Sequence, residues 1–291
     1  MADEPYEAFR LQYNGGADQP QTIGYRLMKP ATIEPGKSYP LVLFLHGSGE
    51  RGEDNAAQLA YFPRAMASEK HRDAFPCFVL APQCRQGEKW VDVDWSDSAA
   101  TAMAESPTPM MRAAIEMLKR TLAEHPVDAS RVYITGLSMG GYGAWDLVAR
   151  HPQWFAAAVI VCGGGDDAQA AKLAELPIWV FHGDADSVVP VARSRNMVAA
   201  IRDAGGETIK YSELPGVGHA SWHHAYADDS GAIPWMFDQQ RTKYCFESQK
   251  HDSVGDRGGL AGDHLLHQRH DDLPVDAFGH REPFDLFKGI I

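Results

Sequence analysis

The sequence predicts an α/β fold with a mostly parallel central sheet and helices on both of its faces. Three observations predict it. The segment PLVLFLHG at 40–47 is a continuous apolar run, which is typical of a strand buried on both faces of a parallel sheet. Strand-like and helix-like patterns then alternate from about residue 77 to residue 214. The composition is that of a globular protein, with 44% hydrophobic and 23% charged residues.

The segment before the first apolar run is expected to form antiparallel edge strands. Apolar and polar residues alternate there, around Phe9, Leu11 and Tyr13 and again around Ile23 and Tyr25. We therefore assign residues 1–30 to the edge of the sheet.

The middle of the chain is expected to build βαβ units. We predict strands at 77–83, 131–136, 155–164, 177–183 and 207–214, and helices at 110–125, 139–151 and 191–206. Strands joined in this way by helices lie parallel to one another. A single α/β domain over 1–242 follows.

The last part of the chain, 243–291, differs in character and is interpreted as a C-terminal extension of unknown role. It holds five of the 13 histidines and shows no strand or helix period. His264, His267, His270 and Asp271 have a spacing that a transition metal could use on one helix face. A solvated polar tail is the favoured interpretation, and no metal site is predicted.

Residues Gly136 to Gly140 form a G-x-S-x-G motif centred on Ser138. The motif directly follows a predicted strand and opens a predicted helix, which is the setting of a nucleophile elbow. The alternative is a serine that only caps the helix. We expect Ser138 to be a nucleophile, which requires a base and an orienting acid.

The acid is expected in HGDADSVVP, at the end of the predicted strand 177–183. This segment offers two candidates, Asp184 and Asp186. Asp184 directly follows Gly183 and is suited to capping that turn. Asp186 is therefore favoured, although it could instead cap the helix that begins near Pro190.

The base is expected after the last strand, in ELPGVGHASW. His219 follows a glycine turn at the end of that strand, where open α/β sheets place their sites. His223 and His224 compete, but they lie in a segment that reads as helical. His219 is favoured.

Backbone N–H groups are needed to stabilise the negative charge on a substrate carbonyl oxygen. Met139, which follows the nucleophile, is expected to provide one. Ser48, in the glycine-rich loop His46-Gly47-Ser48-Gly49, is expected to provide the other. The alternative for this loop is a tight turn with no further role.

Five segments in this order, HGSGERGEDN, APQ, GLSMGG, HGDADSVVP and GVGHASW, resemble the esterase, or predicted-peptidase, branch of the α/β-hydrolases. That branch is related to dienelactone hydrolases, phospholipase/carboxylesterases and polyhydroxybutyrate-depolymerase-like esterases. The resemblance spans roughly residues 20–240. It implies the α/β-hydrolase fold and carboxyl ester hydrolysis without a cofactor. It says nothing about the tail from 243.

Two segments are expected to shape the cleft. Only about 13 residues, 164–176, separate two predicted strands where many lipases insert a lid, so no large lid domain is expected. The long segment 84–108 carries Trp90 and Trp95, and long loops in compact enzymes are often functional. Together with Trp222 they could form a substrate-binding subsite, or they could cover the edge of the core.

Charge and hydropathy limit the partners. A formal net charge of −12 disfavours nucleic acid. No apolar run approaches the ~20 residues of a membrane helix. The N-terminus MADEPYEAF lacks the basic start and apolar stretch of a signal peptide, so the compartment stays open, as does the oligomeric state. The expected partner is a small-molecule ester.

The cysteines also leave one alternative open. Cys77 and Cys84 could be bridged, although two reduced thiols are favoured, and Cys162 is expected to be a buried thiol.

The sequence thus predicts a carboxyl ester hydrolase with a Ser-His-Asp triad and an acyl-serine intermediate, acting on short-chain or aromatic esters of the feruloyl or acetyl type. A serine peptidase of the same fold and a catalytically silent binding module are the alternatives.

Overall fold

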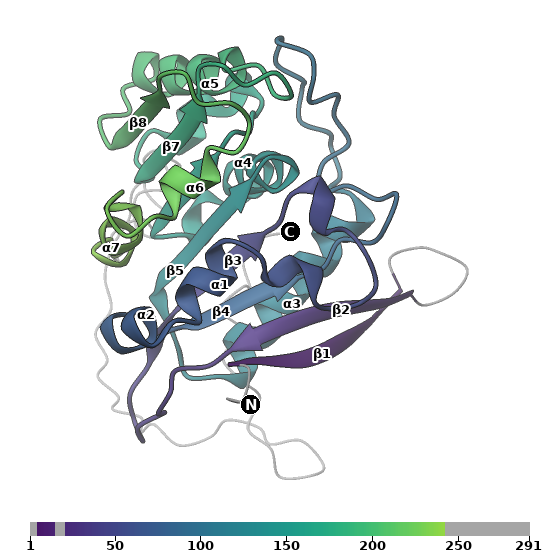
Figure 1. The fold of residues 1–291 in the computed structure, drawn as a ribbon, viewed down its shortest axis with the longest axis vertical. Helices are drawn as coiled ribbons and strands as arrows, with labels where there is room; N and C mark the ends of the chain where they lie inside the picture. The colour runs from purple at the N-terminus through teal and green to yellow at the C-terminus, as the bar shows by residue number, and fades with distance from the viewer. Residues whose placement is uncertain (1–4, 15–20, 242–291) are drawn as a thin grey trace, which may run out of the picture. The chain divides into compact units, whose positions relative to one another are not determined.

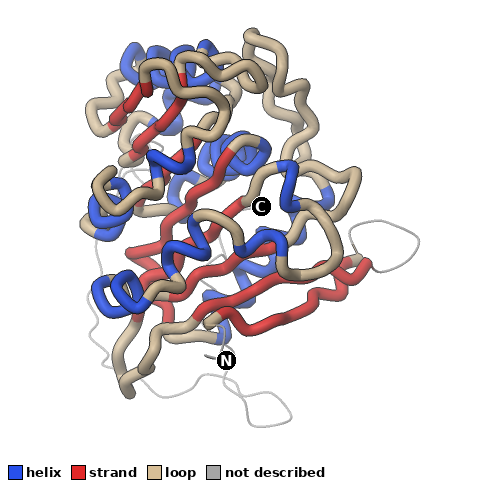
Figure 2. Tube along the Cα trace, viewed as in Figure 1, coloured by secondary structure: helices blue, strands red, loops and turns tan. Residues whose placement is uncertain are grey.

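A computed structural model of the chain describes residues 5–14 and 21–241. Within these residues, eight strands form one sheet in the order β1-β2-β4-β3-β5-β6-β7-β8, drawn in red in Figure 2. The strands are β1 (Tyr6–Tyr13), β2 (Gln21–Met28), β3 (Tyr39–Leu45), β4 (Phe78–Pro82), β5 (Val127–Leu137), β6 (Ala157–Val161), β7 (Ile178–Gly183) and β8 (Ile209–Leu214).

The sheet is mostly parallel, as predicted. β1 pairs with β2, and β2 with β4, in antiparallel register, whereas all pairs from β4 to β8 are parallel. Parallel pairing brings the carboxyl ends of these strands to one edge of the sheet. Leu45 at the end of β3 lies opposite Gly136 in β5, and Gly183 at the end of β7 lies opposite Leu214 in β8.

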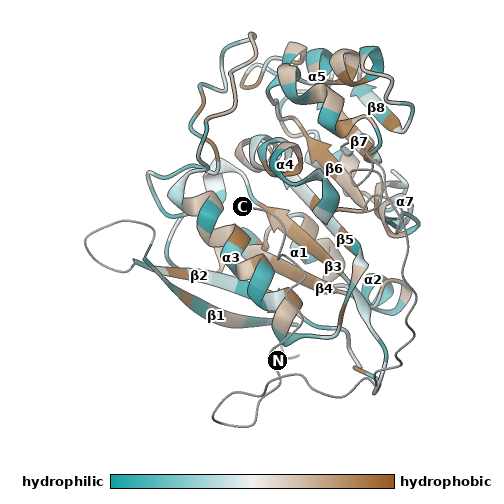
Figure 3. Ribbon diagram, turned by 180° about the vertical axis from the view of Figure 1, so that it is seen from behind, coloured by the Kyte–Doolittle hydropathy of each residue, from teal (hydrophilic) through white to brown (hydrophobic). Residues whose placement is uncertain are grey.

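Helices cover both faces of the sheet. α1 (Phe62–Met66), α2 (Glu69–Ala74), α6 (Trp222–Ala225) and α7 (Ala232–Phe237) lie in front of it in Figure 1. α3 (Pro109–Glu124), α4 (Met139–Arg150) and α5 (Ala192–Asp203) lie in front in the reverse view of Figure 3. Four short 3-10 helices complete the described elements: η1 (Ser48–Glu50), η2 (Ala57–Leu59), η3 (Pro152–Trp154) and η4 (Asp167–Leu173).

The continuous apolar run of β3 is explained by these two layers. Alternate side chains of a strand point to opposite faces, so Leu41, Leu43 and Leu45 join the core under α3, α4 and α5. Val42 and Phe44 join the core on the α1 side. All five are fully buried.

Two local features differ from the sequence-based expectation. β5 begins at Val127 rather than at residue 131, because Val127 pairs with Tyr39 across an irregularity in the β3–β5 register. The helices α1, α2 and α7 were not predicted, because elements of five or six residues are too short to show a helical period.

The predicted boundary between 1–242 and 243–291 stays a prediction, because the tail, with its histidines and Cys245, lies outside the described residues. Cys77, Cys84 and Cys162 are free, buried thiols, which agrees with the favoured alternative. None of the described helices is both long and apolar enough to cross a bilayer.

Candidate active site

Ser138 stands at the sharp turn between β5 and α4. Its backbone has φ 52° and ψ −120°, a strained conformation that bulky L-residues rarely adopt and that is frequent at functional sites. Its N–H donates to the carbonyl of Val161, the last residue of β6, over 3.0 Å. The turn therefore has the geometry of the nucleophile elbow that the sequence predicts.

The glycines of the motif are required by close backbone packing around this turn. A Cβ added to Gly136 would lie 2.2 Å from the carbonyl oxygen of Gly140, and one added to Gly140 would lie 1.9 Å from that of Leu45. Only glycine lets α4 begin this close to β3 and β5. The small residues thus hold Ser138 at the carboxyl edge of the sheet.

His219 connects the serine to an aspartate. It lies in the loop after β8, and its Nε2 is 2.9 Å from Ser138 Oγ. Its Nδ1 is 2.7 Å from Oδ2 of Asp186, which lies in the loop after β7. The structure therefore brings together the three residues that the sequence predicts as nucleophile, base and acid.

The carboxylate of Asp186 is buried and accepts from several donors. Oδ1 accepts from the backbone N–H groups of Val188 (2.8 Å) and Val189 (3.0 Å). Oδ2 faces His219, and also Nε2 of His182 at 3.2 Å. Burial raises the pKa of Asp186, but hydrogen bonds from His182, His219 and the two backbone amides outweigh burial and hold this pKa well below its usual range.

The ionised Asp186 decides where the protons of His219 lie. A carboxylate only accepts, so His219 Nδ1 carries a hydrogen. In the neutral ring Nε2 then has a free lone pair directed at the Ser138 hydroxyl. This tautomer follows from the hydrogen-bond partners, and it is the one that a general base for Ser138 requires.

The competing residues lie elsewhere. Asp184 is exposed, and its Oδ1 accepts from the N–H of Gly216 at 2.7 Å, so it holds the turn that precedes His219. His223 and His224 are exposed on α6, outside the hydrogen-bonded group.

The two predicted backbone donors, Ser48 and Met139, lie at the ends of adjacent strands. Met139 opens α4, where the first N–H groups of a helix have no intrahelical partner. Ser48 opens η1 directly after β3. A Cβ on Gly47 would lie 2.8 Å from a side-chain carbon of Leu137, so the loop after β3 packs against the start of the elbow.

His46, which sequence reasoning did not single out, holds this loop in place. Its Nε2 accepts from the N–H of Cys84 (2.9 Å), so its Nδ1 carries the hydrogen that is donated to Gly47 O (2.6 Å). Burial lowers the pKa of His46 to about 4, which keeps the ring neutral.

The prediction that Trp90 contributes to a substrate-binding subsite is wrong. Its side chain is fully buried, its Nε1 donates to the carbonyl of His46 at 3.0 Å, and its ring packs edge-on against that imidazole. Trp90 is a core residue beneath the loop that carries Ser48.

Trp95 and Trp222 are partly buried and keep some exposed surface. Trp222 packs edge-on against His219, with ring centroids 5.3 Å apart, and Tyr61 packs against Trp222 at 5.2 Å. Tyr61 has a backbone φ of 60°, a strained value for an aromatic residue. The site is thus flanked by an aromatic pair of which the sequence predicted one member.

Trp95 belongs to the 84–108 segment, in which the structure has neither helix nor strand. The buried guanidinium of Arg193 in α5 holds this segment, donating to the carbonyls of Asp94 (2.9 Å) and Asp97 (2.7 Å). A mainly apolar hollow lies beneath it, lined by residues of this segment, of α4 and of α5; its lining includes none of the three hydrogen-bonded residues.

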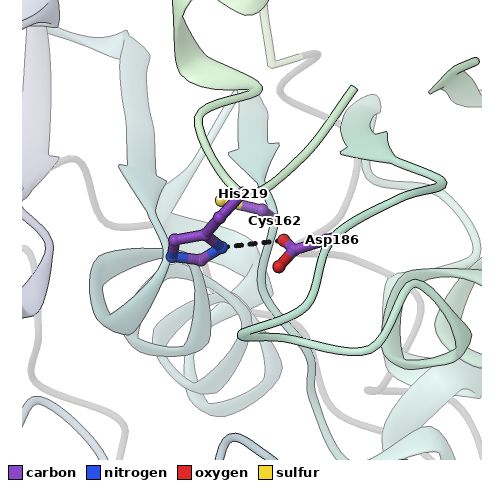
Figure 4. Close-up of side chains that lie close together, drawn as sticks. All are labelled: Cys162, Asp186 and His219. Carbon is purple, nitrogen blue, oxygen red and sulfur yellow. Dashed lines mark hydrogen bonds and ion pairs between the residues drawn. The ribbon is translucent and has the colours of Figure 1, made fainter. Parts of the chain in front are cut away.

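One group of side chains has the atom types of a metal site. Cys162, Asp186 and His219 place their ligand atoms within 4.8 Å of one another (Figure 4). However, Asp186 and His219 are hydrogen-bonded to each other, and burial raises the pKa of the Cys162 thiol to about 12. A metal would have to displace both protons, so the group fits a hydrogen-bonded site better than a metal centre.

Comparisons with known proteins identify the family and agree with the fold. The model of the phospholipase/carboxylesterase family matches residues 29–230. A probable inactive carboxylesterase of Oryza sativa subsp. japonica is 27% identical, over 64% of this chain and 85% of that protein. Acyl-protein thioesterase 1 of Debaryomyces hansenii is 24% identical, over 68% of this chain and 90% of that protein.

Among solved structures, a thermostable esterase superimposes with a TM-score of 0.73 at 37% sequence identity. The alignment covers 81% of this chain and 64% of the esterase, so the chain spans slightly less than two thirds of that relative.

Proposed function

This chain belongs to the phospholipase/carboxylesterase family of α/β-hydrolases, and from that membership we propose that it hydrolyses carboxyl esters through a Ser138–His219–Asp186 triad. The observation that carries the proposal is the continuous line of hydrogen bonds from Ser138 Oγ through His219 to the Asp186 carboxylate. A serine hydroxyl is a weak nucleophile unless a neighbouring base accepts its proton. The line supplies that base in the required tautomer.

The reaction proceeds in two halves. Ser138 Oγ attacks the ester carbonyl carbon while its proton passes to His219 Nε2, and the buried Asp186 stabilises the imidazolium that forms. The tetrahedral intermediate expels the alcohol, which takes the proton from His219 and leaves an acyl-serine. Water, activated by the same imidazole, then releases the carboxylic acid and restores Ser138.

The oxyanion of each intermediate is assigned to the backbone N–H groups of Ser48 and Met139. Met139 stands at the N-terminus of α4, where the helix dipole also favours negative charge. His46 and Trp90 support the Ser48 loop from below through buried hydrogen bonds. These contacts favour a donor position that is set before substrate binds.

Hydrolysis of p-nitrophenyl acetate and of a peptide p-nitroanilide by the purified protein tests the proposal. We expect turnover of the ester and little or no turnover of the anilide. Turnover of the anilide at a comparable rate would favour the peptidase alternative. A fully folded protein that turns over neither substrate would be a catalytically silent module. The rice relative, which is described as a probable inactive carboxylesterase, is an example of that outcome.

We expect catalytic efficiency to peak at acyl chains of about two to four carbons. The connection between β6 and β7 contains only the 3-10 helix η4 and no lid domain. In an open cleft, each further methylene of a longer acyl chain stays in water and contributes none of the ~0.8 kcal/mol that its burial would give. A series of p-nitrophenyl esters from acetate to palmitate measures this, and a maximum at about twelve carbons or more would contradict an open cleft.

Aromatic acyl esters are the expected exception to this trend. Trp222 and Tyr61 present ring surface beside His219, and offset or edge-on aromatic contacts add ~0.5–1.5 kcal/mol beyond area burial. A feruloyl ester included in the series tests whether this contact gives a higher catalytic efficiency than the short aliphatic chains do.

Metal chelators are expected to leave ester hydrolysis unchanged. The proposed triad needs no metal, because the ionised Asp186 and the backbone donors supply the charge stabilisation. Activity measured before and after dialysis against EDTA tests this. Activity that is lost on chelation and restored by zinc would instead favour metal binding by Cys162, Asp186 and His219 or by the tail histidines.

A further inference from the structure

We propose that His182 is a positioning residue that holds Asp186 in the orientation required for catalysis. This inference rests on the proposed function, since it concerns the acid of the proposed triad. His182 lies in β7, which ends at Gly183, and its side chain is fully buried. Its ring nitrogens contact Ser194, Val189 and Asp186, so its link to the triad runs through Asp186.

Oδ2 of Asp186 lies between two imidazoles. His219 Nδ1 is 2.7 Å from it, and His182 Nε2 is 3.2 Å from it. Oδ1 accepts from the backbone N–H groups of Val188 and Val189. Four donors thus surround one carboxylate, and only the His219 contact leads to the reacting serine.

The proton on His182 Nε2 follows from its neighbours. Besides the Asp186 carboxylate, Nε2 lies 3.0 Å from the carbonyl oxygen of Val189. Both oxygens are acceptors only, so Nε2 must carry a hydrogen that the two oxygens share. Because Val189 also donates its own N–H to Asp186, the imidazole ties the carboxylate and the turn that carries it into one unit.

The other ring nitrogen anchors His182 to the scaffold. Nδ1 is 2.7 Å from Oγ of Ser194 in α5. The one hydroxyl hydrogen of Ser194 goes either to Nδ1 or to the carbonyl oxygen of Gly163, which lies 3.0 Å away. Ser194 is fully buried as well. The orientation of Asp186 is therefore linked to β7 and α5, although Asp186 itself lies in a loop.

This anchoring has a catalytic consequence. A carboxylate in an irregular loop can rotate about its side-chain bonds, and a displacement of about 1 Å at a reacting group can cost on the order of 100-fold in rate. With Nε2 of His182 on one side, Oδ2 stays in line with His219 Nδ1. Loss of that donor should lower turnover and leave substrate binding unchanged.

Two amide substitutions at His182 distinguish a positioning role from a role in filling space only. The side-chain nitrogen of His182→Gln reaches the place of Nε2 and can donate to Asp186, whereas that of His182→Asn reaches only the place of Nδ1, near Ser194. With p-nitrophenyl acetate, we expect kcat of His182→Asn to fall by about 100-fold at unchanged KM, and that of His182→Gln to stay within about tenfold of wild type.

A double-mutant cycle tests whether His182 acts through Asp186. In the Asp186→Asn background, the further change His182→Asn should lower kcat by less than about threefold, because the carboxylate that it positions is already gone. Thermal melting of every variant monitors the fold. If His182→Asn does not fold, Ser194→Ala, which removes the hydroxyl beside Nδ1 and leaves the imidazole in place, should lower kcat by about tenfold at unchanged KM.

The outcomes are distinguishable. Equal losses in His182→Gln and His182→Asn, or a full loss from His182→Asn in the Asp186→Asn background, would overturn the positioning role while leaving the proposed function intact. A wild-type protein without ester hydrolysis would overturn the proposed function and this inference together.

Discussion

Replacing Ser138 by alanine is expected to reduce ester turnover by about a million-fold, the usual cost of removing a serine nucleophile. No other hydroxyl is hydrogen-bonded to His219 among the described residues, so the variant has no substitute for Oγ. What activity is left should come from the backbone donors and substrate binding alone. Steady-state hydrolysis of p-nitrophenyl acetate measures the loss.

The fold of Ser138→Ala is expected to be unaffected. The Ser138 side chain makes one hydrogen bond, to a partly exposed His219, and the strained backbone is held by Val161 and the neighbouring glycines. Ser98→Ala, at an exposed serine of the 84–108 segment, is the matched control and should keep full activity. A pure Ser138→Ala protein that keeps more than about a tenth of wild-type turnover would mean that the nucleophile is elsewhere.

Replacing Asp186 by asparagine is expected to reduce turnover by roughly ten-thousand-fold. The reason lies in the donors around the carboxylate. Oδ1 faces two backbone N–H groups, so the amide oxygen of asparagine should take that place and turn its NH₂ toward His219. His219 Nδ1 would then accept, Nε2 would carry the proton, and the ring could no longer take one from Ser138.

Asp184→Asn is the matched control, since it makes the same change two residues away. Asp184 is exposed, and its bond from the Gly216 N–H can be kept by the amide oxygen of asparagine. We expect a far smaller loss than for Asp186→Asn. The reverse ranking in kcat would make Asp184 the acid and would contradict the hydrogen-bonded line seen in the structure.

Much of this architecture could be predicted because its signals are local. The apolar run of β3, the alternation of strands and helices, and the glycines around Ser138 each depend on neighbours a few residues away. The parallel topology then places the ends of β5, β7 and β8 at one edge of the sheet. For that reason the order Ser138, Asp186, His219 along the chain already predicted that the three would meet.

What the sequence could not decide were contacts between distant segments. Trp90 and Trp222 are both tryptophans in loops, yet one is fully buried and the other keeps exposed surface beside His219. The buried Trp90 donates its indole N–H to the carbonyl of His46, 44 residues away in the chain. No local pattern distinguishes the two cases.

The sequence by itself thus determined the α/β-hydrolase fold, the elbow at Ser138 and the region in which an acid and a base would be found. The tertiary structure decided that Asp186 rather than Asp184 is hydrogen-bonded to His219, and it revealed His46 and His182 as the buried histidines behind the site. His46 and His182 each stand at the end of an apolar run and are followed by glycine. This pattern indicates that a polar side chain is buried, but not which group it hydrogen-bonds. The physical reason is that a strand or turn is specified by adjacent residues, whereas a buried hydrogen bond depends on which distant donor and acceptor the packed chain brings within about 3 Å.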